Sequence, residues 1–396
     1  MALPVRKIDG KLLKWARRIR EDLHRHPELG YQERRTASVV ADSLREAALD
    51  NVRTEVAETG VIGLLRGARP GGTVALRADM DALPIREQTG LGYASVNEGV
   101  MHACGHDGHV AILLATARVL AQMRDQIAGS VKFIFQPAEE GGAGGKRMVE
   151  AGCLKDPDVD AIFALHARSG IKPGQIQLSL TSNAGVNGFE MTVRGKGGHG
   201  ARPHECVDPV AIGAQIITAA QTVVSREMRP DRPVVLSFCG FQAGTKNNII
   251  PDSAKLLGTI RALDMADLRR VRRALGRLAG NVARSMRGEV AIHDDELYPP
   301  VKNDARMLEL VREVGGDLLG KRNVLGSPEQ RMGGEDFAFY LADQGGAPGV
   351  IFGLGIESRE NLHTARFDFG SAALEPGILM MANLALRALD RVTNAK

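Results

Sequence analysis

The chain has 396 residues, of which 44% are hydrophobic and 25% charged, and its formal net charge is +4. These proportions are ordinary for a globular protein and too apolar for a disordered one. No stretch approaches about 18 consecutive apolar residues, so we expect no membrane span, and the weak charge demands no anionic partner. The charged N-terminus and the four cysteines without a CxxC pair argue against a secretory signal and a disulfide framework, so we expect a cytoplasmic protein.

The first part and the end of the chain alternate helical patterns with short apolar runs typical of strands. Predicted helices span 11–26, 36–48, 108–123, 304–318 and 372–392, and predicted strands span 73–78, 131–136, 160–166 and 348–354. Strands that alternate with helices predict an α/β fold, with a mostly parallel sheet covered by helices on both faces.

The middle of the chain follows a different order: strand, helix, two strands, helix, strand. The predicted strands span 189–194, 234–241, 255–263 and 289–293, and the predicted helices span 209–228 and 266–287. This order is the ferredoxin-like pattern. We therefore predict an α+β domain at about 187–294, inserted into an α/β domain made of 1–186 and 295–396.

The predicted helix 266–287 carries seven arginines beside an apolar face. Such a stripe can bind nucleic acid, but it is more often the solvated face of a helix that packs on a core. We favour the solvated face, because the net charge is small and no nucleic-acid-binding module is visible. No nucleic-acid partner and no membrane partner are expected.

The densest group of metal-binding residue types is MHACGHDGH at 101–109. If this segment is extended or looped, Cys104 and His106 point the same way, because they lie two residues apart. Thiolate and imidazole are good ligands for zinc and related transition metals. The alternative is a histidine cluster that only caps the following helix, and the density of the cluster favours a metal site.

Further candidates follow predicted strands, where the ligand sites of α/β sheets lie. Two adjacent glutamates at a strand end could be a solvated pair, but several strand ends deliver such residues toward one crevice. A metal hydrolase needs ligands that leave a water molecule bound and a carboxylate that takes its proton. The set is large enough for two ions. Its members are Asp79, Asp81, Glu139, Glu140, His166 and His363.

The inserted domain carries three weaker candidates. His199 lies among glycines in GKGGHGARPHECVDP at 195–209, and it could reach a substrate or an oxyanion, although a surface turn is the better reading of this segment alone. Asn248 lies in a polar turn or donates an amide to substrate. Arg261 could bind a substrate carboxylate through two hydrogen bonds, or it could be an exposed strand residue.

Ordered motifs cover most of the chain. They are LHRHPELGYQE at 23–33, LRADMDALPI at 76–85, MHACGHDGH at 101–109, FQPAEEGGAGG at 135–145, LHA at 165–167, GKGGHGARPH at 195–204, NIIPD at 248–252, MGGEDFAFY at 332–340 and LHTARFDF at 362–369. This series resembles the co-catalytic metallopeptidase family of aminoacylases and carboxypeptidases. The branch it resembles most holds hippurate hydrolases, auxin-conjugate amidohydrolases and N-acetyl-diaminopimelate deacetylases.

The resemblance implies a metal-binding catalytic domain, residues 1–186 and 295–396, and a lid, residues 187–294, that also forms a homodimer. It implies two divalent ions, zinc or manganese, with nickel and cobalt also suited to the donors. The implied ligands are Cys104, His106, Glu140, His166 and His363. The implied general base is Glu139, Asp79 supports catalysis, and His199 completes the active site of the partner subunit.

Two departures from the family pattern line the implied pocket and leave the substrate open. They are the segment ARSGIKPG after His166, and Ala365 where relatives commonly have proline. The sequence therefore predicts a metal-dependent amidohydrolase that acts on a small N-acyl amino acid. The alternatives are a dipeptidase or carboxypeptidase on the same scaffold, and a metal-loaded binding protein without catalysis.

Overall fold

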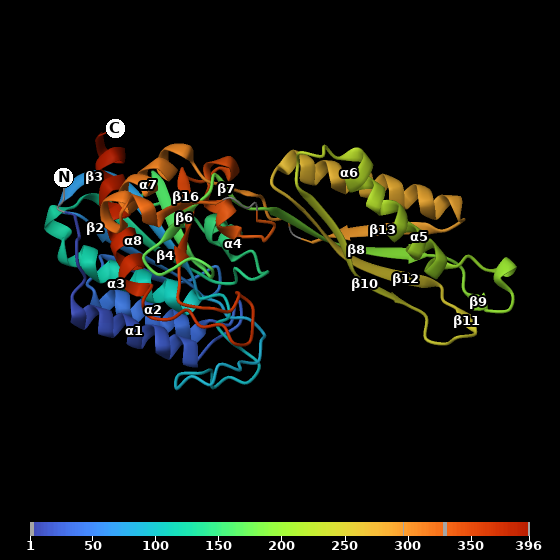
Figure 1. The fold of residues 1–396 in the computed structure, drawn as a ribbon, viewed down its shortest axis with the longest axis horizontal. Coiled ribbons are helices and arrows are strands. Elements are labelled where there is room, and N and C mark those ends of the chain that lie inside the picture. Colours follow the sequence, from blue (N-terminus) through green and yellow to red (C-terminus); the bar gives the residue numbers. More distant parts are fainter. Residues whose placement is uncertain (1–3, 296, 328–330, 395–396) are drawn as a thin grey trace. The chain divides into compact units, whose positions relative to one another are not determined.

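The structure is a computed structural model that describes residues 4–295, 297–327 and 331–394 (Figure 1). Its contacts divide the chain into two compact units. Unit 1 comprises Met1–Ser182, Lys302–Pro328 and Asp336–Lys396, and unit 2 comprises Asn183–Val301 and Glu329–Glu335. The long range of unit 2 contains the predicted insertion 187–294, whose role as a lid stays a prediction.

Unit 1 is built on an eight-stranded sheet in the order β1-β2-β4-β3-β5-β16-β6-β15. The four central strands, β4, β3, β5 and β16, are parallel neighbours, whereas β1 and β2 pair antiparallel at one edge. The strands are β1 (Asn51–Val56), β2 (Gly60–Arg66), β3 (Arg69–Asp79), β4 (Ala128–Gln136), β5 (Ala161–Arg168), β6 (Ile176–Leu178), β15 (Val324–Gly326) and β16 (Gly349–Gly355). The predicted mostly parallel sheet is confirmed.

Helices pack against this sheet and against one another. They are α1 (Gly10–Arg25), α2 (Arg34–Glu46), α3 (His106–Gln122), α4 (Gly144–Glu150), α7 (Ala305–Leu319) and α8 (Leu374–Asn394). Helix α3 is buried along most of its length and contacts both α8 and the sheet, which explains why its sequence is apolar on all sides. Among the described residues, no helix combines the length and apolar character that crossing a bilayer requires.

Unit 2 has its own antiparallel sheet in the order β10-β12-β8-β13 and its own apolar core. Its main elements are β8 (Gly185–Arg194), α5 (Pro209–Thr222), β10 (Val234–Ala243), β12 (Ser253–Ala262), α6 (Met265–Ser285) and β13 (Glu289–Asp294). This is the predicted strand-helix-strand-strand-helix-strand order. Asp208 and Asp264 accept backbone N–H groups as N-caps, so both helices begin where their caps lie.

Smaller elements complete the description. In unit 2, β9 (Gly198–His199) and β11 (Ile249–Ile250) form a two-stranded ribbon. The strands β7 (Thr181–Asn183) and β14 (Val301–Lys302) cross the sequence boundaries between the units. Helix α5 stops at Thr222 and continues as a π-helical turn over Val223–Glu227, so the predicted helix 209–228 is regular only in its first part.

Candidate metal centre

The parallel strands of unit 1 bring the predicted site residues to one edge of the sheet. Strand β3 ends at Asp79 and pairs in parallel with β4, which Glu139 and Glu140 follow. Strand β5 carries His166 near its end and pairs in parallel with β3 and β16. His363 lies between β16 and α8. Because the carboxyl ends of parallel strands share an edge, these residues start from neighbouring positions.

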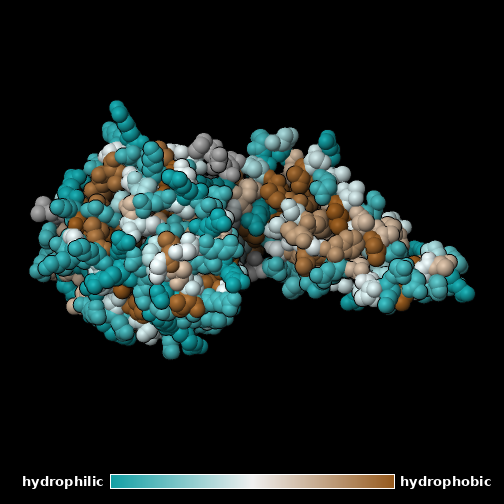
Figure 2. Space-filling model, turned by 60° about the horizontal axis from the view of Figure 1, so that its bottom comes forward, coloured by the Kyte–Doolittle hydropathy of each residue, from teal (hydrophilic) through white to brown (hydrophobic). Residues whose placement is uncertain are grey.

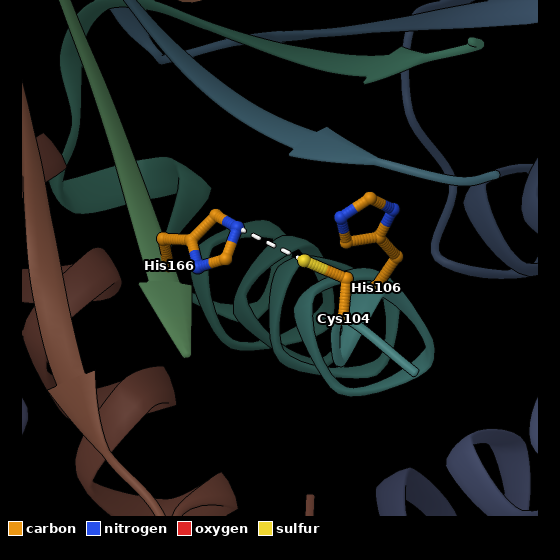
Figure 3. A group of neighbouring side chains, drawn as sticks. All are labelled: Cys104, His106 and His166. Carbon is orange, nitrogen blue, oxygen red and sulfur yellow. Dashed lines mark hydrogen bonds between the residues drawn. The ribbon is translucent and has the colours of Figure 1, made fainter. Parts of the chain in front are cut away.

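Three predicted ligands meet in a small buried volume. The potential ligand atoms of Cys104, His106 and His166 all lie within 4.8 Å of one another. The Sγ atom of Cys104 is 3.5 Å from Nε2 of His166. Figure 3 shows His166 reaching in from the end of a strand, while Cys104 and His106 come from a loop and the helix that it begins.

A loop that leads into a helix joins Cys104 to His106. His106 is the first residue of α3, and Gly105 before it has a left-handed φ of 88°. A Cβ atom at Gly105 would come within 2.9 Å of the Phe369 ring and 3.1 Å of Ala167. The segment is therefore looped, one of the two expected conformations, and a tight glycine turn brings the two side chains together.

Glu140 and His363 form a second group that shares Cys104 with the first. Nε2 of His363 lies 3.0 Å from Oε1 of Glu140 and 3.3 Å from Sγ of Cys104. The backbone N–H of His363 donates to the carbonyl oxygen of Ala103 at 2.8 Å, which ties the two loops together. All five predicted ligands thus lie in two overlapping groups.

Glu139, the predicted base, lies in a third group, with His106 and Glu140, whose potential ligand atoms are also within 4.8 Å of one another. Glu139 is buried, with only 7% of its surface exposed to solvent. A buried carboxylate beside candidate ligands is well placed to exchange a proton with a water molecule held among them.

Asp81 contacts the candidate ligands more directly than the predicted support residue does. Its backbone carbonyl oxygen lies 2.8 Å from Nδ1 of His106, which donates to it when protonated at that nitrogen. Its Oδ2 accepts the backbone N–H of Glu140 at 2.9 Å. Such contacts orient a ligand and leave Nε2 of His106 toward a metal ion. The sequence placed both Asp79 and Asp81 at this strand end, but the resemblance implied a supporting role for Asp79 alone.

Asp79 is fully buried, and its carboxylate contacts the ring of His109. Its carboxylate lies 2.7 Å from Nη1 of Arg77 and 2.6 Å from Nδ1 of His109. Nε2 of His109 accepts the backbone N–H of Ala167, next to His166, at 2.9 Å. Burial would raise the pKa of Asp79, but His106 and Arg77 hold it well below its usual range. The buried carboxylate stays charged and supports, through His109, the end of β5 that carries His166.

The electrostatics of the site favour a bound cation. Burial and the nearby carboxylates of Glu140 and Glu139 raise the pKa of the Cys104 thiol well above its usual value. Burial would lower the pKa of His106, but Asp79 and Asp81 outweigh it and raise the pKa to about 10. Nε2 of His106 is buried and has no hydrogen-bond partner. Thiol, imidazole and carboxylate donors, which give up any bound proton when a metal binds, fit divalent ions.

Two of the three site candidates of unit 2, His199 and Asn248, are exposed. His199 is on β9, opposite Ile249 on β11, and its Nδ1 accepts the backbone N–H of Ala201 at 3.1 Å. The neutral ring therefore carries its proton on Nε2 and can donate it. The backbone carbonyl of Asn248 accepts the N–H of Gly200 at 2.8 Å, so both candidates belong to one ribbon.

Arg261 lies on β12, apart from that ribbon in the sheet of unit 2. The residue is partly buried, and its Nη1 donates to the carbonyl oxygen of Met332 at 2.9 Å. The contact uses one nitrogen of the guanidinium group. The substrate roles of His199, Asn248 and Arg261 stay predictions.

The sequence matches the family model described as peptidase family M20/M25/M40 over residues 75–387. The chain belongs to this family. The predicted resemblance is thereby confirmed, and so is the prediction of a metal-dependent hydrolase. The alternative of a metal-loaded protein without catalysis is set aside.

Relatives in the M20/M25/M40 family carry several hydrolase names. The chain is 38% identical to N-acetylcysteine deacetylase of Bacillus subtilis, over 94% of this chain and 97% of the relative. It is 38% identical to thermostable carboxypeptidase 1 of Saccharolobus solfataricus, over 97% and 96%. The solved YxeP protein of Bacillus subtilis, described as a dinuclear metal-binding peptidase, is 35% identical, with a TM-score of 0.84 over 96% of this chain and 99% of that chain. Together with the donor groups, this neighbour supports a site for two divalent ions.

Proposed function

We propose that the protein hydrolyses the amide bond of N-acyl amino acids. One observation carries the proposal: the carboxylate of Glu139 is buried and grouped with His106 and Glu140. Glu140, the next residue in the chain, is itself a candidate ligand. The relative named as a deacetylase of an N-acetyl amino acid supports this substrate class.

Cys104, His106, Glu140, His166 and His363 would hold the two ions. Bound divalent ions lower the pKa of a water molecule toward about 7 and polarise the acyl carbonyl. Glu139 takes the proton of the attacking water and returns it to the nitrogen of the leaving amine. One water molecule is consumed, and the products are a carboxylic acid and an amino acid.

We propose zinc or manganese as the native metal. The Cys104 thiol favours zinc, whereas the carboxylate and imidazole donors also suit manganese, nickel and cobalt. Elemental analysis of protein purified without added metal, followed by reloading with each ion, distinguishes them. Recovery of the highest activity with magnesium or calcium would contradict the proposal.

The substrate proposal is tested with a panel of N-acetyl and N-benzoyl amino acids assayed beside dipeptides. We expect release of free amino acid from the N-acyl compounds, with lower kcat/KM for the dipeptides. Because one relative is named a carboxypeptidase, peptide hydrolysis is the main alternative activity. Faster cleavage of dipeptides than of every N-acyl amino acid would replace the proposal with a peptidase.

We also propose a homodimer formed through unit 2. Helix α5 has no charged residue between Pro209 and Thr222, and the uncharged strand β10 is the edge of its sheet. Val210 and Phe241 on these elements are 38% and 39% exposed. Figure 2 shows apolar side chains gathered on one face of unit 2. An uncharged edge strand beside an apolar helix suits pairing with a second copy.

In that dimer, we propose that His199 donates from Nε2 to the oxyanion formed in the partner subunit's site. Mixing Glu139→Gln with His199→Ala protein tests this. Neither variant alone should be active, and each mixed dimer regains one complete site, so random mixing restores about a quarter of the normal activity. A mixture that stays as inactive as its components, with mixed dimers demonstrated by mass, would contradict the shared site.

We propose a cytoplasmic location for the enzyme. Its four cysteines are free, and a thiol ligand such as Cys104 requires a reducing compartment. Fractionation of expressing cells with activity measured in each fraction checks the location, and activity confined to a secreted or periplasmic fraction would contradict it.

A further inference from the structure

A pocket beside the candidate metal centre points to the determinant of acyl specificity. It lies entirely within unit 1 and encloses about 230 Å³. Two of its lining residues, Asp81 and Glu140, also contact or belong to the ligand groups. A group bound in this pocket is therefore next to the place where an acyl carbonyl would react.

Apolar side chains form part of the pocket wall. Leu29, Leu83 and Pro84 line it together with Ala82 and Ala138. Among the described residues that line it, none is basic, and the charged ones are carboxylates. The pocket consequently favours a neutral, apolar group and disfavours an anionic one, which would meet like charge without a cationic partner.

The size of the pocket indicates a single substituent. Sites for whole drug-sized ligands usually have about 300–1,000 Å³, so the observed volume is small for a complete molecule. A cavity of about 150 Å³ in another protein holds benzene, so an aromatic ring fits into this one with room to spare. The pocket therefore matches the acyl part of a substrate whose amino-acid part lies elsewhere.

The walls are held by backbone contacts and so exist before a ligand binds. The N–H of Ala82 donates to the carbonyl of Glu28 at 2.8 Å, and Leu83 pairs with Met101 through two hydrogen bonds of 3.0 Å. The Tyr31 hydroxyl donates to the Gly142 carbonyl at 2.5 Å across another part of the lining. A preformed pocket selects among acyl groups by fit.

We propose that this pocket binds the acyl group of the substrate and accepts neutral groups up to the size of an aromatic ring, with Leu29 as a specificity-determining residue. The inference rests on the proposed amidohydrolase function. Leu29 is suited to the test because the residue lines the pocket and is only partly buried. Its replacement changes the pocket volume without removing a candidate ligand.

The experiment compares kcat/KM for N-benzoyl, N-acetyl and N-succinyl derivatives of one amino acid. We expect Leu29→Trp to reduce kcat/KM for the benzoyl compound at least tenfold and for the acetyl compound less than threefold. Leu29→Ala should leave the benzoyl compound active and extend turnover to larger apolar acyl groups. The succinyl compound should be the poorest substrate of the unaltered enzyme.

Leu308→Trp is the matched control, because Leu308 is a partly buried leucine on α7 that does not line the pocket. Titration calorimetry of the benzoyl compound into the Glu139→Gln protein, with and without Leu29→Trp, measures binding separately from turnover. Weaker binding of the benzoyl compound to the double variant than to Glu139→Gln alone supports binding of the acyl group in this pocket. Equal effects of Leu29→Trp on benzoyl and acetyl turnover would overturn the assignment of this pocket to the acyl group and leave the proposed function standing. No turnover of any N-acyl amino acid would overturn the proposed function and this inference with it.

Discussion

The candidate residues of unit 1 and those of unit 2 are built in opposite ways. In unit 1, His106, His109 and His166 are buried and hold one another through carboxylates and backbone groups. In unit 2, His199 and Asn248 are exposed on a short ribbon. A buried cluster of metal-binding groups, with Nε2 of His106 lacking a hydrogen-bond partner, gains stability from a bound cation, whereas an exposed ribbon costs little in folding. Changes in unit 1 should therefore alter metal content and stability, and changes in unit 2 should alter only the reaction.

The largest effect is expected from Glu139→Gln. The variant keeps the size of the side chain but cannot take a proton, so kcat should fall by about 10²–10⁴-fold. Metal content should stay unchanged, as determined by elemental analysis beside the kinetics. The matched control is Glu150→Gln on the exposed face of α4. A Glu139→Gln enzyme with near-normal kcat would exclude Glu139 as the base.

The next largest effect is expected from Cys104→Ser. Loss of the thiol removes the donor that both ligand groups share, so affinity for zinc should fall by at least about 100-fold. Because the pKa values of Cys104 and His106 are raised, metal uptake at pH 7 should release about two protons per site, and the variant fewer. Competition with a chromophoric chelator and a pH indicator measures both. Unchanged zinc affinity would show that metal binding in unit 1 does not depend on the Cys104 thiol.

A third test uses the pH dependence of stability around His24, which lies 2.9 Å from Asp107 and 3.3 Å from Glu87. Burial would lower its pKa, but these carboxylates raise it to about 9. The raised pKa stabilises the folded protein by up to about 3 kcal/mol below pH 6.5, and this contribution is lost as the pH rises through about 9.

The difference in unfolding free energy between the unaltered protein and His24→Gln should therefore be larger at pH 6 than at pH 9.5. Denaturant unfolding at both pH values measures it. His26→Gln is the control, because that ring is partly exposed and contacts the backbone of Asp22. A difference that does not vary with pH would mean that the charge of the His24 ring is not what stabilises unit 1.

The smallest effect is expected in unit 2, from Arg261→Gln. If Arg261 binds the substrate carboxylate, KM should rise about tenfold with little change in kcat, and Arg261→Lys should recover part of the loss. Metal content and the unfolding midpoint of unit 1 should not change. A loss of metal in Arg261→Gln would contradict the expectation that changes in unit 2 leave the metal content of unit 1 unchanged.

Much of the fold could be predicted because its central elements carry their own signals. The apolar run at 108–123 became α3, and the strand patterns at 73–78 and 131–136 became β3 and β4. The edge strand β1 and its neighbour β2 were missed. Residues Asn51–Val56 are mostly exposed and polar, so their pairing with β2, rather than a local pattern, makes them a strand.

Glu140, His166 and His363 could be grouped because they lie at or after strand ends, and Cys104 and His106 because their cluster is dense. The sequence could not show which nearby carboxylate supports them. Asp79 and Asp81 lie two residues apart at one strand end, and the partners that distinguish them come from distant segments. The i, i+3 spacing of His106 and His109 on one helix was the available signal that both rings face the same way. It could have linked His109 to the site, although its contact with Asp79 depends on the sheet.

The contact between Cys104 and His363 joins residues 259 positions apart in the chain. At ordinary rates of protein synthesis, roughly 10 to 50 s pass between the emergence of the thiol and that of this imidazole. The complete donor set therefore arises only after β16 and the segment that carries His363 have been synthesised. Metal loading is in this sense a late step of maturation, and until then the nascent enzyme carries a reactive thiol that the cell must keep reduced.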